Sequence, residues 1–356
     1  MGWKTYSLFP FIIVIFMPSS LLMVFISMVQ VNKNGGVIKP INAKIFQDPL
    51  ADGDILFDGF DNYTGAPFPI IPNLVHFVLF GRNSLDFTTF LCMMAALKIQ
   101  RPHRLFLHTD AENGTFTGHY WEQLLMTATK MVPINITGNK MYPPKVKLIS
   151  RSRPTHVYGQ RLSSVWHAAD VARLDLLKKY GGMTLDGDAL ILRPFTPFRH
   201  FEMAIGWPEN GYIGSQVIVA HPKARLLRLW LESYRVYRPR LWYYNAGQLP
   251  TQQILFHHPS LVHRVPVLFG VHNLAEQLYS SSKDVAEKSW WRKEGFYSIH
   301  LLSRHRNYLA HSNINSGALI DEQSVLKDNT YFGQMARWIL YDIEPTLPLP
   351  SRDSNG

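Results

Sequence analysis

The stretch that most constrains the fold of this chain runs from residue 160 to residue 195. Its first part has the apolar spacing of a helix, and two glycines then stop the helix in the usual way. The apolar run Met183–Leu192 follows, and we interpret it as a strand that carries Asp186 and Asp188 in its interior. Two carboxylates in such a strand are costly to bury without a partner, so a partner is expected.

Residues two apart on a strand point to the same side, so Asp186 and Asp188 would present their carboxylates together. Gly187 between them allows a close backbone approach. Hard oxygen ligands and substrate phosphates commonly hold Mg²⁺ or Mn²⁺, and such a metal is the partner we predict. A phosphatase with Asp186 as its nucleophile is the rival enzyme reading. It is disfavoured because Leu190 stands where that motif needs Thr or Val.

A helix is predicted over Leu162–Tyr180, before the two glycines. Asp170 and Arg173 are three residues apart and can share one face of this helix. An ordinary surface ion pair is the alternative interpretation. The flanking residues are mostly apolar and leave the pair little open surface, which favours a place in a buried site.

Strands and helices are expected to alternate through the globular part of the chain. We predict strands over Asn73–Phe80, Arg104–His108 and Val146–Ser150, and helices over Leu85–Ile99 and His119–Val132. This alternation predicts an α/β fold with a parallel sheet, in which ligands bind at the carboxyl ends of the strands.

Three polar residues lie near such strand ends, namely His76, His108 and Asp110. His76 is a candidate donor-binding residue, with a satisfied core histidine as the alternative. Asp110 is placed to contact a nucleotide, with a turn residue as the alternative.

The run from Tyr6 to Val31 contains no charged residue and is long enough for a helix that crosses a bilayer. A cleaved signal peptide is the alternative, but its apolar core would be shorter and followed by a small-residue cleavage site. The predicted organisation is a cytoplasmic tail, a membrane anchor, a stem, a catalytic domain and a tail, at residues 1–5, 6–31, 32–70, 71–345 and 346–356.

Three N-x-S/T sequons, at Asn62, Asn113 and Asn135, follow the predicted anchor. They favour a lumenal main body. The net charge of +10 suits an anionic ligand or a membrane surface. We find no zinc-finger spacing, no long basic run and no RNA-binding signature, so a nucleic-acid partner is not expected. Cys92 is the single cysteine, which excludes an intrachain disulfide and a cysteine zinc site.

Residues 169–195, ADVARLDLLKKYGGMTLDGDALILRPF, resemble the DXD-containing sugar-binding region of Och1-like, or family-32, glycosyltransferases. That group includes α1,4-galactosyl- and N-acetylglucosaminyltransferases. The resemblance extends more loosely from residue 71 to about residue 300. The chain departs from the family pattern at Ala169, Thr184 and Gly187, where serine, tyrosine and threonine are common. None of these departures removes a charged group.

This resemblance implies a GT-A (Rossmann-like) fold and a retaining, metal-dependent transferase with a nucleotide-sugar donor. By position, Asp186 and Asp188 match the motif that binds Mn²⁺ (or Mg²⁺) and diphosphate. Asp170 and Arg173 match residues that hold the donor sugar and its phosphate. A C-terminal histidine supplies a third metal ligand in related enzymes. His300 is the candidate here, with two later histidines, at positions 305 and 311, as competitors.

Family members often have an asparagine-rich turn where this chain has Gly214-Ser215-Gln216. Gln216 is therefore a candidate to lie at the β face of the donor sugar, where a retaining enzyme stabilises the developing cation. A polar residue that enters a strand is the alternative. Trp242 and Tyr243 could stack on acceptor sugars, with core packing as the alternative.

Together these inferences predict a Golgi type II membrane glycosyltransferase. It would transfer a hexose or N-acetylhexosamine with retention, from a UDP-sugar in preference to other donors, to a glycan acceptor on lipid or protein. A GDP-mannose-dependent mannosyltransferase is one alternative. A non-catalytic, membrane-anchored carbohydrate-binding protein is another, and the four intact charged donor residues argue against it.

Overall fold

The computed structural model of this protein describes residues 57, 59–131, 133–136, 139–141, 143–280, 290–302 and 320–345. The predicted anchor, most of the predicted stem and the predicted C-terminal tail lie outside these ranges. Within them, no helix has both the length and the apolar character that a membrane crossing requires.

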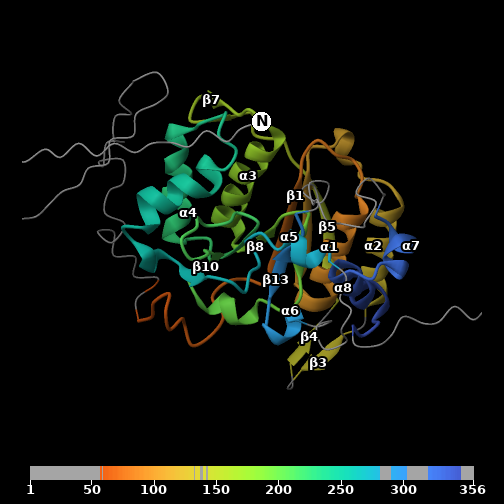
Figure 1. Cartoon of the computed structure of the whole chain (residues 1–356). Coiled ribbons are helices and arrows are strands. Elements are labelled where there is room, and N and C mark those ends of the chain that lie inside the picture. The colour runs from red at the N-terminus through yellow and green to blue at the C-terminus, as the bar shows by residue number, and fades with distance from the viewer. Residues whose placement is uncertain are drawn as a thin grey trace, which may run out of the picture. The chain divides into compact units, whose positions relative to one another are not determined.

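A seven-stranded sheet forms the centre of the described fold (Figure 1). Its order is β12-β10-β11-β8-β1-β2-β5. Neighbouring strands are parallel except at β11, which is antiparallel to both β8 and β10. The parallel sheet predicted from the sequence is thus present on one side of a mixed sheet. The strands are β1 (Leu74–Leu79), β2 (Arg104–Thr109), β5 (Lys145–Ser150), β8 (Gly182–Leu185), β10 (Met203–Gly206), β11 (Val217–Ala220) and β12 (His263–Val265).

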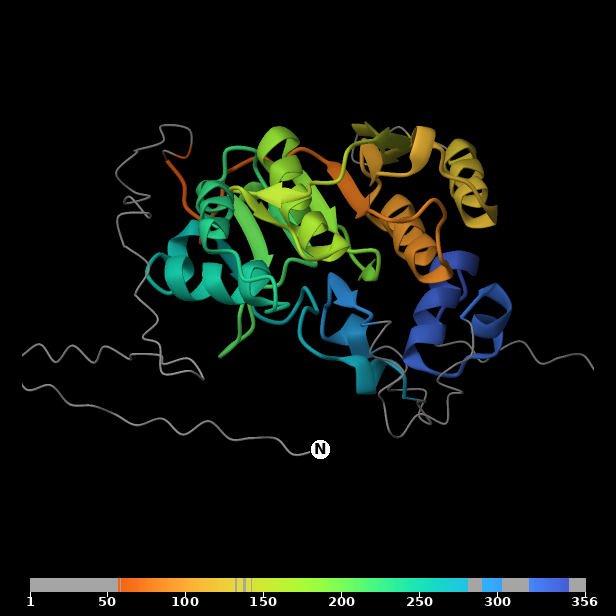
Figure 2. The same ribbon diagram turned by 90° about the horizontal axis from the view of Figure 1, so that it is seen from above.

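Helices cover both faces of this sheet, as the side chains of β1 show. Val75 and Phe77 pack into the apolar cluster that includes α1, whereas Val78 and Phe80 pack against Ala172 and other residues of α3. Figure 2 shows the C-terminal helices α7 and α8 beside α1. The helices are α1 (Phe87–Ala95), α2 (His119–Lys130), α3 (Val165–Tyr180), α4 (Arg225–Ser233), α5 (Ala275–Leu278), α6 (Trp290–Lys293), α7 (Glu322–Lys327) and α8 (Tyr331–Tyr341).

Local sequence signals explain where α3 begins and ends. The Ser164 side chain accepts a hydrogen bond from the backbone N–H of His167, which caps the first turn. At the other end Gly181 is the C-cap, as the sequence predicts. Gly182 follows with φ +102°, and a Cβ atom there would lie 2.6 Å from the carbonyl oxygen of Leu74. Only glycine fits this close passage from α3 into β8.

The predicted continuous strand over Met183–Leu192 is wrong. β8 ends at Leu185, residues 186–188 form a turn, and the chain resumes as β9 (Ala189–Ile191). β9 leaves the central sheet and pairs antiparallel with β13 (Ser298–His300). Asp and Gly are depleted in strands and favoured in turns, and this preference outweighs the apolar character of the flanking residues.

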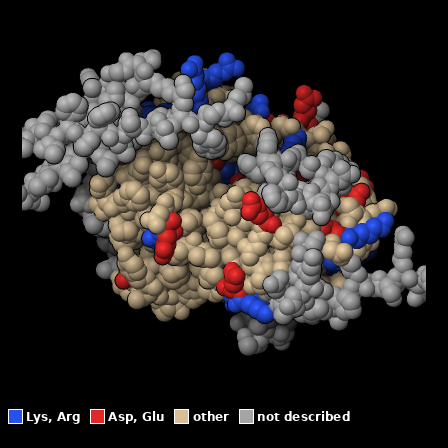
Figure 3. Space-filling model, viewed as in Figure 1, with Lys and Arg blue, Asp and Glu red and all other residues tan. Residues whose placement is uncertain are grey.

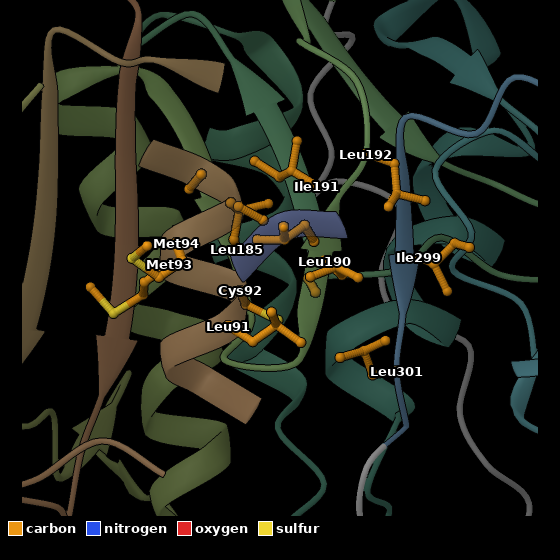
Figure 4. Packing of buried hydrophobic residues seen from close by; sticks show 14 of the residues in the cluster. Leu91, Cys92, Met93, Met94, Leu185, Leu190, Ile191, Leu192, Ile299 and Leu301 are labelled. Carbon is orange, nitrogen blue, oxygen red and sulfur yellow. The ribbon is translucent and has the colours of Figure 1, made fainter. Parts of the chain in front are cut away.

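The apolar residues on both sides of the turn are buried in one core. Figure 4 shows side chains of α1 packed around Leu185, Leu190 and Ile191, with Ile299 of β13 nearby. Cys92 lies in the same core and is fully buried, as the sequence indicates. The turn over residues 186–188 is therefore supported by closely packed apolar side chains on both sides of it and on α1.

The described part of the predicted stem already packs on the domain before Ile71. The backbone N–H of Ala66 donates to the carbonyl of His200 at 2.7 Å, and that of Ile70 donates to Arg199 at 2.9 Å. Asn62 is buried and donates to the carbonyl of Ser260 at 2.9 Å. The sequon at Asn62 therefore gives no support to a lumenal location, because its amide nitrogen is engaged inside the fold.

Four short strands outside the central sheet form two antiparallel pairs. These are β3 (Ile134–Ile136) with β4 (Asn139–Met141) and β6 (His156–Val157) with β7 (Gln160–Arg161). On the face shown in Figure 3, the described Lys and Arg residues are scattered and form no continuous basic stripe.

Candidate metal and donor site

Arg173 joins helix α3 to the acidic turn over residues 186–188. Its guanidinium donates to the carboxylate of Asp170, on the same helix face, and to the carboxylate of Asp186 in the turn. Arg173 is 6% exposed, so this charge is tolerated because two carboxylates flank it. Burial would lower the pKa of Arg173, but Asp186 and Asp170 outweigh it, and the pKa is raised. The predicted pairing of Asp170 with Arg173 is present and buried.

His300 approaches the acidic turn because β13 pairs with β9. The register places His300 opposite Ala189, directly after Asp188, and the Leu301 N–H donates to the Asp188 carbonyl at 2.8 Å. His300 Nε2 lies 3.2 Å from Asp188 Oδ1. One ligand atom each from Asp186, Asp188 and His300 lie within 4.8 Å of one another. The structure thus brings together the three residues predicted to bind metal.

Negative charge dominates this cluster. Burial raises the pKa of Asp186, and Asp188 and Asp170 raise it further, against the opposing effects of Arg173 and His300. Burial lowers the pKa of His300, but the neighbouring Asp188 and Asp186 outweigh it and raise the pKa overall. Residues with shifted pKa values are common in binding sites, where charged groups lie close together. A bound cation would relieve the repulsion between the carboxylates.

The residues present fit a divalent metal with a polar ligand. Two carboxylates and an imidazole are donors that Mn²⁺ accepts, and the carboxylates suit Mg²⁺ as well. Within the described part of the chain, three buried polar atoms of the site lack a hydrogen-bond partner: Arg173 Nε, Gln216 Oε1 and His300 Nδ1. Such atoms are rare in native structures, and a water, an ion or a polar ligand could supply the partner that each of the three lacks. The two later histidines considered as competitors lie outside the described residues.

Ser215 is a site residue that the sequence analysis did not single out. Its hydroxyl donates to Asp170 Oδ1 at 3.2 Å and lies 3.5 Å from Arg173 NH2. Ser215 lies in the turn before β11, and its partners Asp170 and Arg173 lie 45 and 42 positions earlier on α3. No local sequence signal could therefore have found it.

Gln216 contacts the acidic turn through its backbone. Its carbonyl accepts a hydrogen bond from the Asp186 N–H at 2.9 Å. Its side-chain oxygen folds over Gly214, where an added Cβ atom would lie 2.1 Å away. Gly214 therefore makes room for the Gln216 amide beside the turn.

Gly187 approaches helix α1 closely. A Cβ atom at this position would lie 3.0 Å from Thr89 Oγ1 and 3.4 Å from Leu79 Cδ2. The close backbone approach predicted for Gly187 is thus made to the protein's own core. This contact sets the distance between the acidic turn and α1.

Asp110 follows β2 at the carboxyl edge of the sheet, as predicted. Its carboxylate accepts from the Gly81 N–H at 2.6 Å and lies 3.5 Å from Arg153 Nε. It therefore ties together the loops after β1 and β2, on the side of β8 away from β11.

His76 lies apart from the acidic turn. Its Nδ1 is 3.1 Å from His108 Nε2, its Nε2 is 3.2 Å from the Gly181 carbonyl, and its ring stacks on Phe106. The His76 backbone lies opposite Thr184 in β8, but its ring reaches back to Gly181, which precedes β8, whereas Asp186 follows that strand. Burial lowers the pKa of His76 to about 4. These are the contacts of a core histidine.

Trp242 and Tyr243 differ in their surroundings. Tyr243 is half-buried, and its hydroxyl donates to the carbonyl of Ile213. Burial raises the pKa of Tyr243, and the Asp170 carboxylate raises it further. Trp242 is 58% exposed and stands edge-on to Trp166, with ring centroids 5.4 Å apart. Core packing thus describes Tyr243 but not Trp242.

Comparisons with known proteins find similarities to enzymes, whereas no family model matches the chain. The chain is 24% identical over 214 residues to glucan organizing enzyme 1 of Cryptococcus neoformans var. grubii serotype A. The match covers 54% of this chain and 52% of that protein, so the chain spans about half the length of this curated relative.

Two solved structures named as glycosyltransferases are also similar to this chain. The PaToxG glycosyltransferase is 15% identical, with a TM-score of 0.35, over 55% of this chain and 72% of that one. The glycosyltransferase GlyE of Streptococcus pneumoniae TIGR4 is 10% identical, with a TM-score of 0.39, over 68% and 57%.

Proposed function

We propose that this chain is a metal-dependent glycosyltransferase with a GT-A-like fold, which transfers a sugar from a nucleotide-sugar donor with retention. The observation that carries the proposal is the contact of Arg173 with Asp186. It sets a buried, positively charged group beside a candidate metal site of Asp186, Asp188 and His300. A site with these charges suits the phosphates and the leaving group of a nucleotide sugar.

Asp186, Asp188 and His300 would hold Mn²⁺ or Mg²⁺, which when bound neutralises charge on the leaving diphosphate. Arg173 adds a fixed positive charge next to these ligands. Asp170 is oriented by Arg173 and Ser215, and is placed to accept hydrogen bonds from hydroxyls of the donor sugar. Gln216 has a buried side-chain oxygen without a hydrogen-bond partner, and its backbone carbonyl contacts Asp186. It is proposed to stabilise the cation that develops on the donor sugar. No protein nucleophile is assigned, and the leaving phosphate is proposed to accept the acceptor proton.

The finer features of the proposal rest on the sequence. They are a UDP-sugar donor, a Golgi membrane location, a lumenal catalytic domain and the anchor at residues 6–31. A GDP-mannose-dependent mannosyltransferase and a non-catalytic carbohydrate-binding protein are the alternatives. The name of the relative in Cryptococcus makes a glucan the first acceptor to test.

The test is donor hydrolysis and transfer by the full-length protein in detergent, with a panel of UDP- and GDP-sugars and Mn²⁺. We expect hydrolysis of one donor to disappear with EDTA and to return with Mn²⁺. Asp188→Asn should lower this hydrolysis at least 100-fold, a loss of about 3 kcal/mol in transition-state stabilisation. Asp342→Asn, at a carboxylate with an 82% exposed side chain, is the matched control and should leave it unchanged.

Wild-type activity in Asp188→Asn would contradict the proposal. Donor binding by the wild-type protein without any turnover would favour the carbohydrate-binding alternative. Release of phosphate from a phosphomonoester, without use of a nucleotide sugar, would favour the phosphatase reading.

A further inference from the structure

Two tryptophan rings lie exposed side by side at the start of helix α3. Trp166 is 43% exposed, Trp242 is 58% exposed, and their rings meet edge to face at 5.4 Å. Leu241, next to Trp242, is 46% exposed. Contiguous exposed apolar side chains of this size are unfavourable in water and mark surfaces that bind a ligand or a partner.

Trp166 lies on the helix face that carries the donor-site residues. It precedes Asp170 by four positions and Arg173 by seven, and residues at these spacings share one face of a helix. Helix α3 leads into β8 through a single glycine, so it runs opposite to β8 and begins at the edge of the sheet where the acidic turn lies. At 1.5 Å per residue, Trp166 stands about 6 Å along the axis beyond Asp170.

The loop that carries Trp242 is fastened to the first turn of α3. His167 Nε2 lies 3.2 Å from the Trp242 carbonyl, and its Nδ1 lies 2.5 Å from the hydroxyl of Tyr237. The Ser163 hydroxyl donates to the carbonyl of Pro239 at 3.0 Å. The backbone that carries the two rings is therefore held in place before any ligand binds, which reduces the entropy lost on binding.

Tyr243 connects this aromatic pair to the donor site. It follows Trp242 directly, and its hydroxyl bonds to Ile213. Its ring packs so closely on Gly247 that a Cβ atom there would lie 2.5 Å away. Asp170 lies near enough to Tyr243 to contribute to the raised pKa of its hydroxyl. Tyr243 therefore links the loop of the aromatic pair to the segment at Ile213, two residues before Ser215, whose hydroxyl donates to Asp170.

We propose that Trp166 and Trp242 form a carbohydrate-binding platform that positions a pyranose ring of the acceptor glycan; this rests on the proposed function. A pyranose has an apolar C–H face, which packs on an aromatic face, and hydroxyls at its rim that stay in water. Tryptophan supplies the largest such face with few rotatable bonds.

The position of the platform favours an acceptor over the nucleobase of the donor. Asp110 and the loops after β1 and β2 lie on one side of β8. Trp242 comes from the segment after α4, which packs against α3, on the other side of β8 with β11 (Figure 1). A nucleotide-sugar donor bound between Asp110 and Asp170 would not cover the platform, which would then be accessible to the glycan acceptor.

The test compares full-length wild type, Trp242→Ala, Trp242→Phe and Trp166→Ala, with Phe68→Ala as the control. Phe68 is 64% exposed and lies in the N-terminal segment, so this variant removes an exposed aromatic ring elsewhere. Tryptophan fluorescence is titrated with laminarihexaose, maltohexaose and mannohexaose in the absence of donor. Metal-dependent donor hydrolysis and the acceptor KM for transfer are measured in parallel.

We expect one probe to change the fluorescence of the wild type. Trp242→Ala and Trp166→Ala should weaken this binding and raise the acceptor KM at least tenfold, while donor hydrolysis stays within twofold. Trp242→Phe should restore part of the binding, and Phe68→Ala should leave all three measurements unchanged.

Several results would overturn the platform. One is that the wild type binds none of the probes. A second is that both alanine variants keep the wild-type acceptor KM and probe binding. A third is a raised donor KM in these variants, which would indicate a nucleobase site. If the alanine variants lost self-association or vesicle binding but still bound the probe, the surface would instead bind a second copy of the chain or a membrane. If no donor is hydrolysed, the proposed function fails, and the fluorescence titration still decides whether the platform binds carbohydrate.

Discussion

The guanidinium of Arg173 pairs with the carboxylate of Asp186, thirteen positions later in the chain. The same guanidinium pairs with Asp170, so helix α3 and the acidic turn form one buried electrostatic unit. A displacement of either element would leave a buried charge without its partner, which is strongly unfavourable. The position of the candidate metal ligands is therefore coupled to the position of α3.

Replacement of Arg173 by lysine tests this coupling. Lysine keeps the charge but cannot bridge two carboxylates with a planar fork. We expect the free energy of unfolding to fall by about 2 kcal/mol and Mn²⁺-dependent hydrolysis per folded molecule to fall at least tenfold. Chemical denaturation and the hydrolysis assay measure the two effects.

Arg225→Lys is the matched control for this substitution. Arg225 pairs with the buried Glu202 at 2.8 Å, away from the acidic turn. It should lose comparable stability but keep hydrolysis. An equal loss of hydrolysis in both variants would show that Arg173 acts only through stability.

Gly187→Ala should displace the acidic turn from helix α1. The new Cβ atom would meet Thr89 Oγ1 at 3.0 Å in a well-packed core, which costs about 1–3 kcal/mol. Mn²⁺ affinity, measured by electron paramagnetic resonance of the free ion, should fall with it. Thr89→Ala in the same chain removes the obstructing atoms and should restore both quantities.

Gly211→Ala is the control for the glycine substitution, because its nearest neighbour, Pro208 Cβ, is at an ordinary 3.4 Å. It should change neither stability nor Mn²⁺ affinity. Additive losses in the Gly187/Thr89 double variant would be evidence against this contact as the cause.

The buried pair His76 and His108 should make the fold sensitive to acid. Burial lowers the pKa of His76 to about 4 and that of His108 to about 3, with further lowering of the latter by His76 and Arg151. In the unfolded chain both titrate near 6.5, so below that pH the unfolded state binds more protons. The free energy of unfolding should therefore fall as the pH falls from 6.5 toward 4, on the order of 3 kcal/mol for His76 alone.

His108→Gln tests this, because an amide can replace the Nε2 contact without titrating. The decline in stability between pH 6.5 and 4, followed by urea denaturation, should become shallower than in the wild type. His257→Gln, at an exposed histidine, should leave the decline unchanged. A wild-type curve that is flat over this range would refute the prediction.

Asn62 should act as a structural residue and remain unglycosylated in the folded protein. Its side-chain oxygen accepts from the Glu202 N–H at 3.0 Å, so Asn62→Ala should cost about 1–3 kcal/mol. Thr64→Ala destroys the same sequon but removes only an exposed bond to Asp61, and should cost little. Peptide mapping of protein made in a glycosylating host would contradict this if it found a glycan at Asn62.

Much of the architecture around the site could be predicted from local patterns. Helix α3, its glycine stop, and strands β1, β2 and β5 agree with the predicted segments to within a few residues, because each has a strong apolar period and clear ends. The pairing of Asp170 with Arg173 follows from helix spacing. The approach of His300 depends on β13 pairing with β9, a long-range contact that no local pattern contains.

The differences between the predicted and the observed structure also have physical causes. The strand over residues 183–192 was expected to be continuous because both of its halves are buried, yet Asp186-Gly187-Asp188 is itself a turn signal. The role of Ser215 does not follow from local patterns, because its partners Asp170 and Arg173 lie 45 and 42 positions earlier in the chain. The buried contacts of Asn62 do not follow from its sequon, because its partners Glu202 and Ser260 are far away in the sequence.

The pairing of β9 with β13 also sets the order in which the site can be assembled during synthesis. A nascent chain that has emerged as far as Leu192 already contains Arg173 and the acidic turn, but neither His300 nor the strand that carries it. In the described part of the chain β13 is the sheet partner of β9, so until it arrives β9 has an open edge. We expect firm metal capture only after residue 300 is in place, so a truncated chain would be incomplete in both its fold and its chemistry.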